Sequence, residues 1–131
     1  MSKLQLWMRV VGVLYLFIAG ASLPFGAGPG EPLPGFPFDQ QFAQRMEDYQ
    51  FLGGLMYGVL GAALLYGSRA PEQNLILVWT VVIMEIVRGL LGHAYLLGRG
   101  APSWSYGPLL LLHLVIMLAG IEFARRARTE R

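Results

Sequence analysis

The sequence predicts an all-α integral membrane protein, a bundle of four helices in a single domain that spans residues 1–131. Hydrophobic residues make up 55% of the 131 residues and charged residues only 14%, whereas soluble domains carry about a quarter charged residues. The mean hydropathy is +0.50. The apolar residues gather in four runs, each near the ~20 residues that a helix needs to cross a bilayer. Backbone groups in lipid must bond within their own segment, and no run alternates as a barrel strand does, so we expect helices.

The predicted helices cover residues 4–23, 40–67, 75–97 and 106–124. The apolar run of the second helix begins at Phe51, and we expect the helix itself to begin earlier, near residue 40. Short connections join the second to the third helix and the third to the fourth, so consecutive helices should be antiparallel neighbours. Residues 24–38 form a loop rich in proline and glycine, which cannot continue a helix. We expect this loop on the outer side, as a plain connector or as a lid over the bundle.

The first segment has a second interpretation. Lys3 and Arg9, an apolar stretch and the small residues Ala19-Gly20-Ala21 together resemble a secretory signal with a cleavage site. The apolar run continues through Leu23, which favours a retained helix. Cleavage after Ala21 would leave three helices.

The distribution of basic residues predicts the orientation. With both termini inside, the cytoplasmic flanks hold seven basic residues, namely Lys3, Arg9, Arg69, Arg125, Arg126, Arg128 and Arg131, and the outer flanks hold only Arg45 and Arg99. Cytoplasmic flanks carry an excess of Lys and Arg, so we expect a multi-pass protein of the cell membrane with both termini in the cytoplasm. The basic residues lie at the ends of apolar runs rather than in a patch interleaved with aromatics, which argues against a nucleic-acid partner.

Glu85 is the most informative residue. It lies ten residues beyond Leu75, roughly 15 Å into the bilayer at helical rise, where a charge costs about 3 kcal/mol or more. Arg88, three residues on, is expected on the same helix face as an ion-pair partner. The pair is either a structural contact between helices or part of a functional site, and the sequence does not separate these alternatives.

Other polar residues are expected near the same depth or above it. His93 and His113 should lie in the outer half of the membrane on adjacent helices, and they join Glu85 and Arg88 as candidate catalytic residues. Arg45, Glu47, Asp48 and Tyr49 mark the outer end of the second helix and are candidate ligand-binding residues. Together these side chains can line one cavity. Alternatively, each interacts separately with the membrane interface or with its own helix. No two ligand-type residues have the spacing that places both on one helical face, and the chain has no cysteine, so we expect no metal and no cofactor.

Small residues predict close helix packing at two places. Gly54, Gly58 and Ala62 recur at intervals of four, a pattern that lets helix backbones approach. Packing within the bundle is the preferred interpretation; the alternative is contact with a second copy or a larger membrane complex. Gly89 and Gly92 lie on the Glu85 face of the third helix and leave room for a helix or a ligand.

Several segments resemble one family. Leu77-Val78-Trp79-Thr80, the stretch Glu85-Ile86-Val87-Arg88-Gly89, Tyr95 to Arg99-Gly100, and Trp7-Met8-Arg9-Val10-Val11-Gly12-Val13 with Tyr15-Leu16-Phe17 are similar to the BphX-like proteins. These are small membrane proteins, some encoded among aromatic-degradation genes. The resemblance implies four helices and an association with lipophilic compounds. Gly92-His93 departs from the acidic residues expected after the Glu-Arg-Gly stretch.

Three functions follow as hypotheses. The first is a membrane protein that binds a lipophilic ligand or serves as an accessory subunit of a larger complex. The second is a membrane enzyme, such as an isomerase or epoxide hydrolase, with Glu85 as base, Arg88 as its electrostatic partner and a histidine as acid. The third and weakest is a small proton-coupled exporter with Glu85 as the carrier. The sequence leaves open whether the protein is an enzyme.

Overall fold

The computed structural model describes residues 1–23 and 40–129, and the side chains of residues 1–23 and 51–129. Its elements are α1 (Lys3–Ala21), α2 (Gln40–Gly67), α3 (Leu75–Met84), the π-helix η1 (Glu85–Leu91), α4 (Gly92–Gly98) and α5 (Ser103–Thr129). The elements α3, η1 and α4 follow one another without a break and form the third of four helices. The described part of the chain is therefore all-helical, as predicted. The proline-rich loop 24–38 lies outside the described residues.

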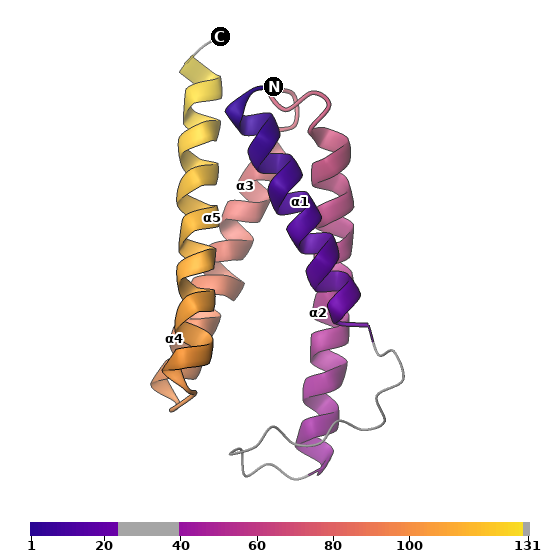
Figure 1. Cartoon of the computed structure of the whole chain (residues 1–131), viewed down its shortest axis with the longest axis vertical. Helices are drawn as coiled ribbons and strands as arrows, with labels where there is room; N and C mark the ends of the chain where they lie inside the picture. The colour runs from indigo at the N-terminus through magenta and orange to yellow at the C-terminus, as the bar shows by residue number, and fades with distance from the viewer. Residues whose placement is uncertain (24–39, 130–131) are drawn as a thin grey trace.

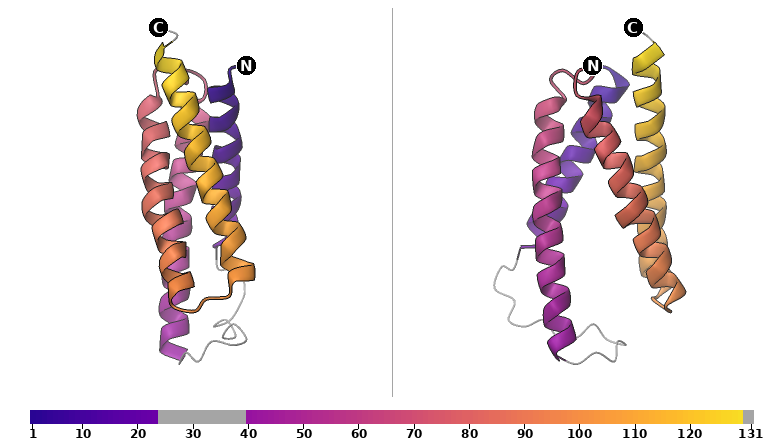
Figure 2. Two further views of the ribbon diagram at one scale, coloured as in Figure 1. Left: turned by 90° about the vertical axis from the view of Figure 1, so that its left-hand side faces the viewer. Right: turned by 180° about the vertical axis from the view of Figure 1, so that it is seen from behind.

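The helices form two antiparallel pairs (Figure 1). α1 lies against α2, and α5 lies against the continuous stretch of α3, η1 and α4. Both termini and the α2–α3 connection lie at one end of the molecule. The two pairs meet at that end and diverge toward the other, where α4 and the start of α5 lie (Figures 1 and 2).

The helix ends explain how the chain turns at the end that holds the termini. The Ser2 hydroxyl caps α1 by accepting a hydrogen bond from the backbone N–H of Gln5 at 3.1 Å, which satisfies one free donor of the first turn. After α2, the side-chain amide of Asn74 donates to the carbonyls of Ala70 at 2.8 Å and Gly67 at 3.3 Å. These bonds add to the backbone hydrogen bonds that the two carbonyls accept from the N–H groups of Gln73 and Ala70, and they hold the short connection that makes α3 antiparallel to α2.

The surface of the molecule is apolar and part of its interior is polar. Phe17, Val59 and Ile76 are more than 70% exposed, whereas Glu85 is 1% exposed. Within the described residues, α1, the stretch 75–98 and α5 are long and apolar enough to cross a membrane, and Phe51–Gly67 of α2 is a shorter apolar helix. Such a surface, with many large apolar side chains exposed, suits lipid better than water.

Small residues bring α1 and α2 into close contact. A Cβ on Gly61 would lie 2.7 Å from the carbonyl oxygen of Gly12, so the two backbones touch where both residues are glycine. Gly58 faces Ala19 of α1, and Gly54 faces Ser22 just beyond the end of that helix, whereas Ala62 is exposed. Gly54 and Gly58 thus pack within the chain. Contact with a second copy or a larger complex stays a prediction.

The helix boundaries differ from the predicted ones mainly in α5, which runs from Ser103 to Thr129 instead of 106–124. The predicted end followed the last apolar residue, but charge ends a membrane crossing without ending a helix. Ala124 and Ala127 are buried, and arginine is a good helix former. The final turns therefore continue the helix beyond the apolar run.

Candidate functional site

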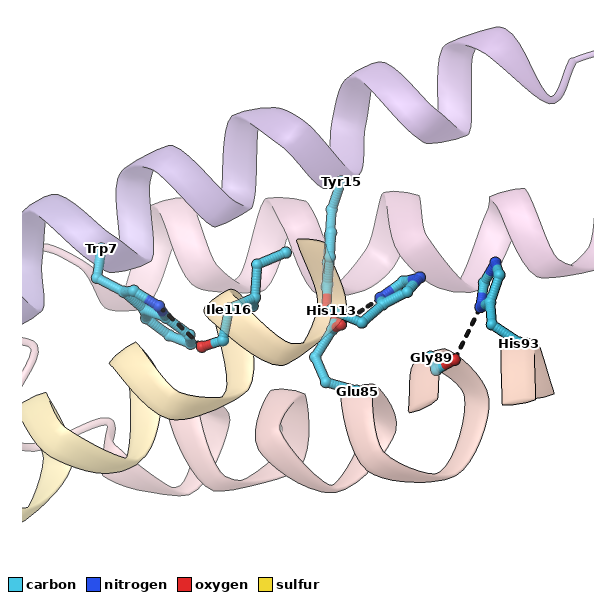
Figure 3. A network of polar contacts seen from close by, with 7 residues as sticks. All are labelled: Trp7, Tyr15, Glu85, Gly89, His93, His113 and Ile116. Atoms are coloured by element: carbon cyan, nitrogen blue, oxygen red, sulfur yellow. Dashed lines mark hydrogen bonds and ion pairs between the residues drawn. The ribbon is translucent and has the colours of Figure 1, made fainter. Parts of the chain in front are cut away.

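The carboxylate of Glu85 lies in the interior where three helices meet. The Tyr15 hydroxyl of α1 donates a hydrogen bond to Oε1, and Nδ1 of His113 on α5 contacts Oε2 (Figure 3). Tyr15 is 1% exposed and His113 8%. With the carboxylate ionised, Nδ1 of His113 is the donor of that contact, because an ionised carboxylate only accepts. One buried acid is thus satisfied by donors from two other helices.

The predicted ion pair between Glu85 and Arg88 is wrong. The ion-pair partner of Glu85 is His113 instead. The reason is the π-helix that begins at Glu85. Its i→i+5 hydrogen bonds widen the turn, so each residue rotates through less than the 100° of an α-helix, and residues three apart no longer share a face.

Arg88 instead reaches across to α2. Its Nη1 donates to the carbonyl oxygen of Gly53 at 3.5 Å, and its guanidinium carbon lies 4.9 Å from the centre of the Tyr57 ring, within the range of a cation–π contact. The Tyr57 ring in turn packs edge-on against Tyr15, with ring centres 4.7 Å apart. Arg88 is therefore connected to Glu85 indirectly, through the side chains of Tyr57 and Tyr15.

His93 extends the group beyond His113. The two imidazole rings lie 4.8 Å apart, and Nδ1 of His93 lies 2.7 Å from the carbonyl oxygen of Gly89. A carbonyl oxygen only accepts, so Nδ1 of His93 is the donor and Nε2 is an acceptor in the neutral ring. In Figure 3 the second nitrogen of His113 points away from Glu85 toward the His93 side. A line of polar groups thus leads from buried Tyr15 to half-buried His93. We call Tyr15, Glu85, His113 and His93 the polar line.

Two glycines make room for these side chains. A Cβ on Gly89 would lie 2.5 Å from Cγ of His113, and a Cβ on Gly53 would overlap the guanidinium of Arg88. Gly92, by contrast, has nothing within 4 Å of its Cβ position. The space predicted beside Gly89 is therefore filled by His113, and that beside Gly92 is open.

The family model for BphX-like proteins matches residues 1–129. The chain belongs to the BphX-like family. The match covers all four helices and the whole polar line. No curated protein and no solved structure matches the chain.

Tyr15 and Trp7 of this BphX-like protein were not among the site residues predicted from the sequence. The indole N–H of Trp7 donates to the carbonyl oxygen of Ile116 at 3.3 Å in the interior (Figure 3), and so ties α1 to α5 beside the polar line. Trp7, Val11 and Tyr15 recur at intervals of four on the buried face of α1. That spacing, with aromatic residues carrying a polar atom at both ends, is the signal that identifies the face.

The remaining candidates of this BphX-like chain lie at the start of α2. Arg45, Glu47, Asp48 and Tyr49 belong to that helix, but their side chains are outside the described part, so their ligand-binding role stays a prediction. Within the described residues, no three His, Asp or Glu side chains are grouped in a way that could hold a metal ion.

Proposed function

We propose that this BphX-like protein resides in the cell membrane, with both termini cytoplasmic, and binds a lipophilic molecule that donates a hydrogen bond to His93. Three apolar helices and an apolar surface support the location. Both termini lie at one end (Figure 1), and most of the basic residues belong to helix ends there. The positive-inside tendency makes that end cytoplasmic.

The observation that supports the binding function is the buried carboxylate of Glu85 within the polar line. An ionisable group at this depth is costly and marks a functional site by default. If Glu85 served only to join helices, its contacts with Tyr15 and His113 would be sufficient. Here the line continues to His93, in a segment whose π-helical turn is of a kind frequent at functional sites.

Accessibility favours His93 over Glu85 as the residue that contacts the ligand. Both oxygens of Glu85 are engaged and the residue is 1% exposed. His93 is half-buried and belongs to α4, at the end where the helix pairs diverge. Its Nε2 is an acceptor in the neutral ring, so the matching ligand is an apolar molecule with a hydroxyl, phenol or acid proton.

The experiment is to identify what stays bound. The protein is purified in a mild detergent, extracted with organic solvent and analysed by mass spectrometry. We expect one lipophilic compound with a hydroxyl or acid group in near-stoichiometric amount, and its loss in His93→Phe, which keeps the ring but removes the acceptor. Tyr95→Phe is the control, because Tyr95 is exposed on the same helix. Binding that survives in His93→Phe, or no compound in the wild type, would refute the proposal.

One observation favours a second candidate, an acid–base enzyme. A carboxylate on Nδ1 of an imidazole fixes its tautomer and turns Nε2 into a base, as in hydrolases that pair His with an acid. Under this proposal His113 is the base, and Glu85 orients it instead of meeting substrate. The compound extracted from the wild type is incubated with fresh protein. A product that separates from the compound by chromatography, with the same or a changed mass, and that Glu85→Gln fails to form supports the enzyme; an unchanged compound supports binding alone.

A further inference from the structure

A cavity of about 360 Å³ lies at the end that holds the termini, opposite the His93 end. It is lined by the chain start and first turn of α1, by the α2–α3 connection and by α5, with the residues Met1, Ser2, Lys3, Leu4, Glu72, Phe123, Arg126 and Ala127. Its volume falls in the range of small-molecule sites. Three separate segments therefore build one concave surface.

The walls of this cavity combine two chemistries. Lys3 and Arg126 supply positive charge from two different helices, and Leu4, Phe123 and Ala127 supply apolar surface. Arg126 donates through Nε to Glu122 at 2.6 Å, which uses one of its five N–H donors. Its side chain is 57% exposed, so the terminal amino groups are accessible for a fork onto two oxygens of one anion.

We infer that this cavity binds the head group of an anionic phospholipid, with the phosphodiester between Lys3 and Arg126 and the glycerol backbone against Leu4 and Phe123. Basic pockets between membrane helices on the cytoplasmic side suit such head groups. A phosphate free in water would use the cations but not the apolar wall. Phosphatidylglycerol is the probe, because its head group carries one phosphodiester anion and no cation. This site is separate from His93; it rests on the cytoplasmic orientation proposed above and not on ligand binding at His93.

Native mass spectrometry of the full chain in mild detergent tests the inference. Phosphatidylglycerol or phosphatidylcholine is added, and the fraction of protein that retains one lipid is measured. Arg126→Gln and Lys3→Gln should each lower the affinity for phosphatidylglycerol about five-fold, and together about twenty-five-fold, the effect of one basic side chain at an anionic lipid. Arg125→Gln is the matched control, because Arg125 is the exposed neighbour on the same helix and does not line the cavity.

Three results would overturn the inference. The first is an Arg125→Gln loss as large as that of Arg126→Gln, which would mean diffuse attraction. The second is equal retention of both lipids. The third is displacement of the lipid by millimolar inorganic phosphate, which would make the free anion the ligand. Lys3→Gln keeps the test valid if Arg126→Gln also disturbs the end of α5, because Lys3 lies on another helix.

Discussion

Gly89 offers a sharp test of the interior. Its Cβ position lies 2.5 Å from Cγ, 2.7 Å from Nδ1 and 2.8 Å from Cβ of His113. These atoms lie at the base of the His113 side chain, so they can move only if α5 shifts or His113 changes its rotamer. Gly89→Ala should therefore push His113 away from Glu85.

The magnitude follows from three contributions. Overpacking a buried site costs about 1–3 kcal/mol, and loss of a hydrogen bond to a charged buried group costs about 1.5–3 kcal/mol. Alanine returns up to about 1 kcal/mol of helix propensity. We expect Gly89→Ala to lower the free energy of unfolding by about 2–5 kcal/mol, measured by loss of helical circular dichroism in detergent on titration with a denaturing detergent.

Gly92→Ala is the matched control for this experiment. Gly92 lies three residues further along the same helical stretch, and its Cβ position has nothing within 4 Å. The same substitution there should be neutral or stabilise the protein by up to about 1 kcal/mol. Equal stability of the two variants would refute the described packing of His113 against Gly89.

Further predictions concern the contacts of Glu85 and Arg88. Tyr15→Phe removes the hydroxyl that donates to Glu85 and should cost about 1.5–3 kcal/mol of unfolding free energy, whereas Tyr66→Phe, at a 72% exposed residue, should cost nothing measurable in the same titration. Glu85→Gln keeps an acceptor for Tyr15 but loses the charge, whereas Glu85→Ala leaves both donors without a partner. The Gln variant should therefore unfold at a higher concentration of the denaturing detergent than the Ala variant. An Ala variant as stable as the Gln variant would contradict this. Gly53→Ala should destabilise by about 1 kcal/mol, because the flexible end of Arg88 moves aside. Its cost should shrink in a double-mutant cycle with Arg88→Ala, and strictly additive costs would contradict the contact.

In the third helix, the sequence predicted the polar residues of the site but not their partners. Depth along an apolar run was enough to select Glu85, Arg88 and His93, because a charge in lipid is rare and costly wherever it lies. Their partners were predicted with α-helical angles, and a single π-helical segment changed those angles. Arg88 consequently faces Gly53 of α2, and Glu85 faces Tyr15 and His113. The periodicity of the apolar residues did not reveal the π-helical turns.

The sequence by itself determined the helical class, the number of helices and the presence of an ionisable group in an apolar run. These follow from hydrophobicity and length, which act residue by residue along the chain. Only the tertiary structure decided that Tyr15 and His113 satisfy Glu85, that Gly89 is reserved for His113, and that Lys3 and Arg126 share a cavity. Those pairings join residues far apart in the chain, and they depend on which helix faces which and at what rotation. Exposed apolar faces are alike in composition, so side-chain volume and polar satisfaction in the assembled bundle select the arrangement.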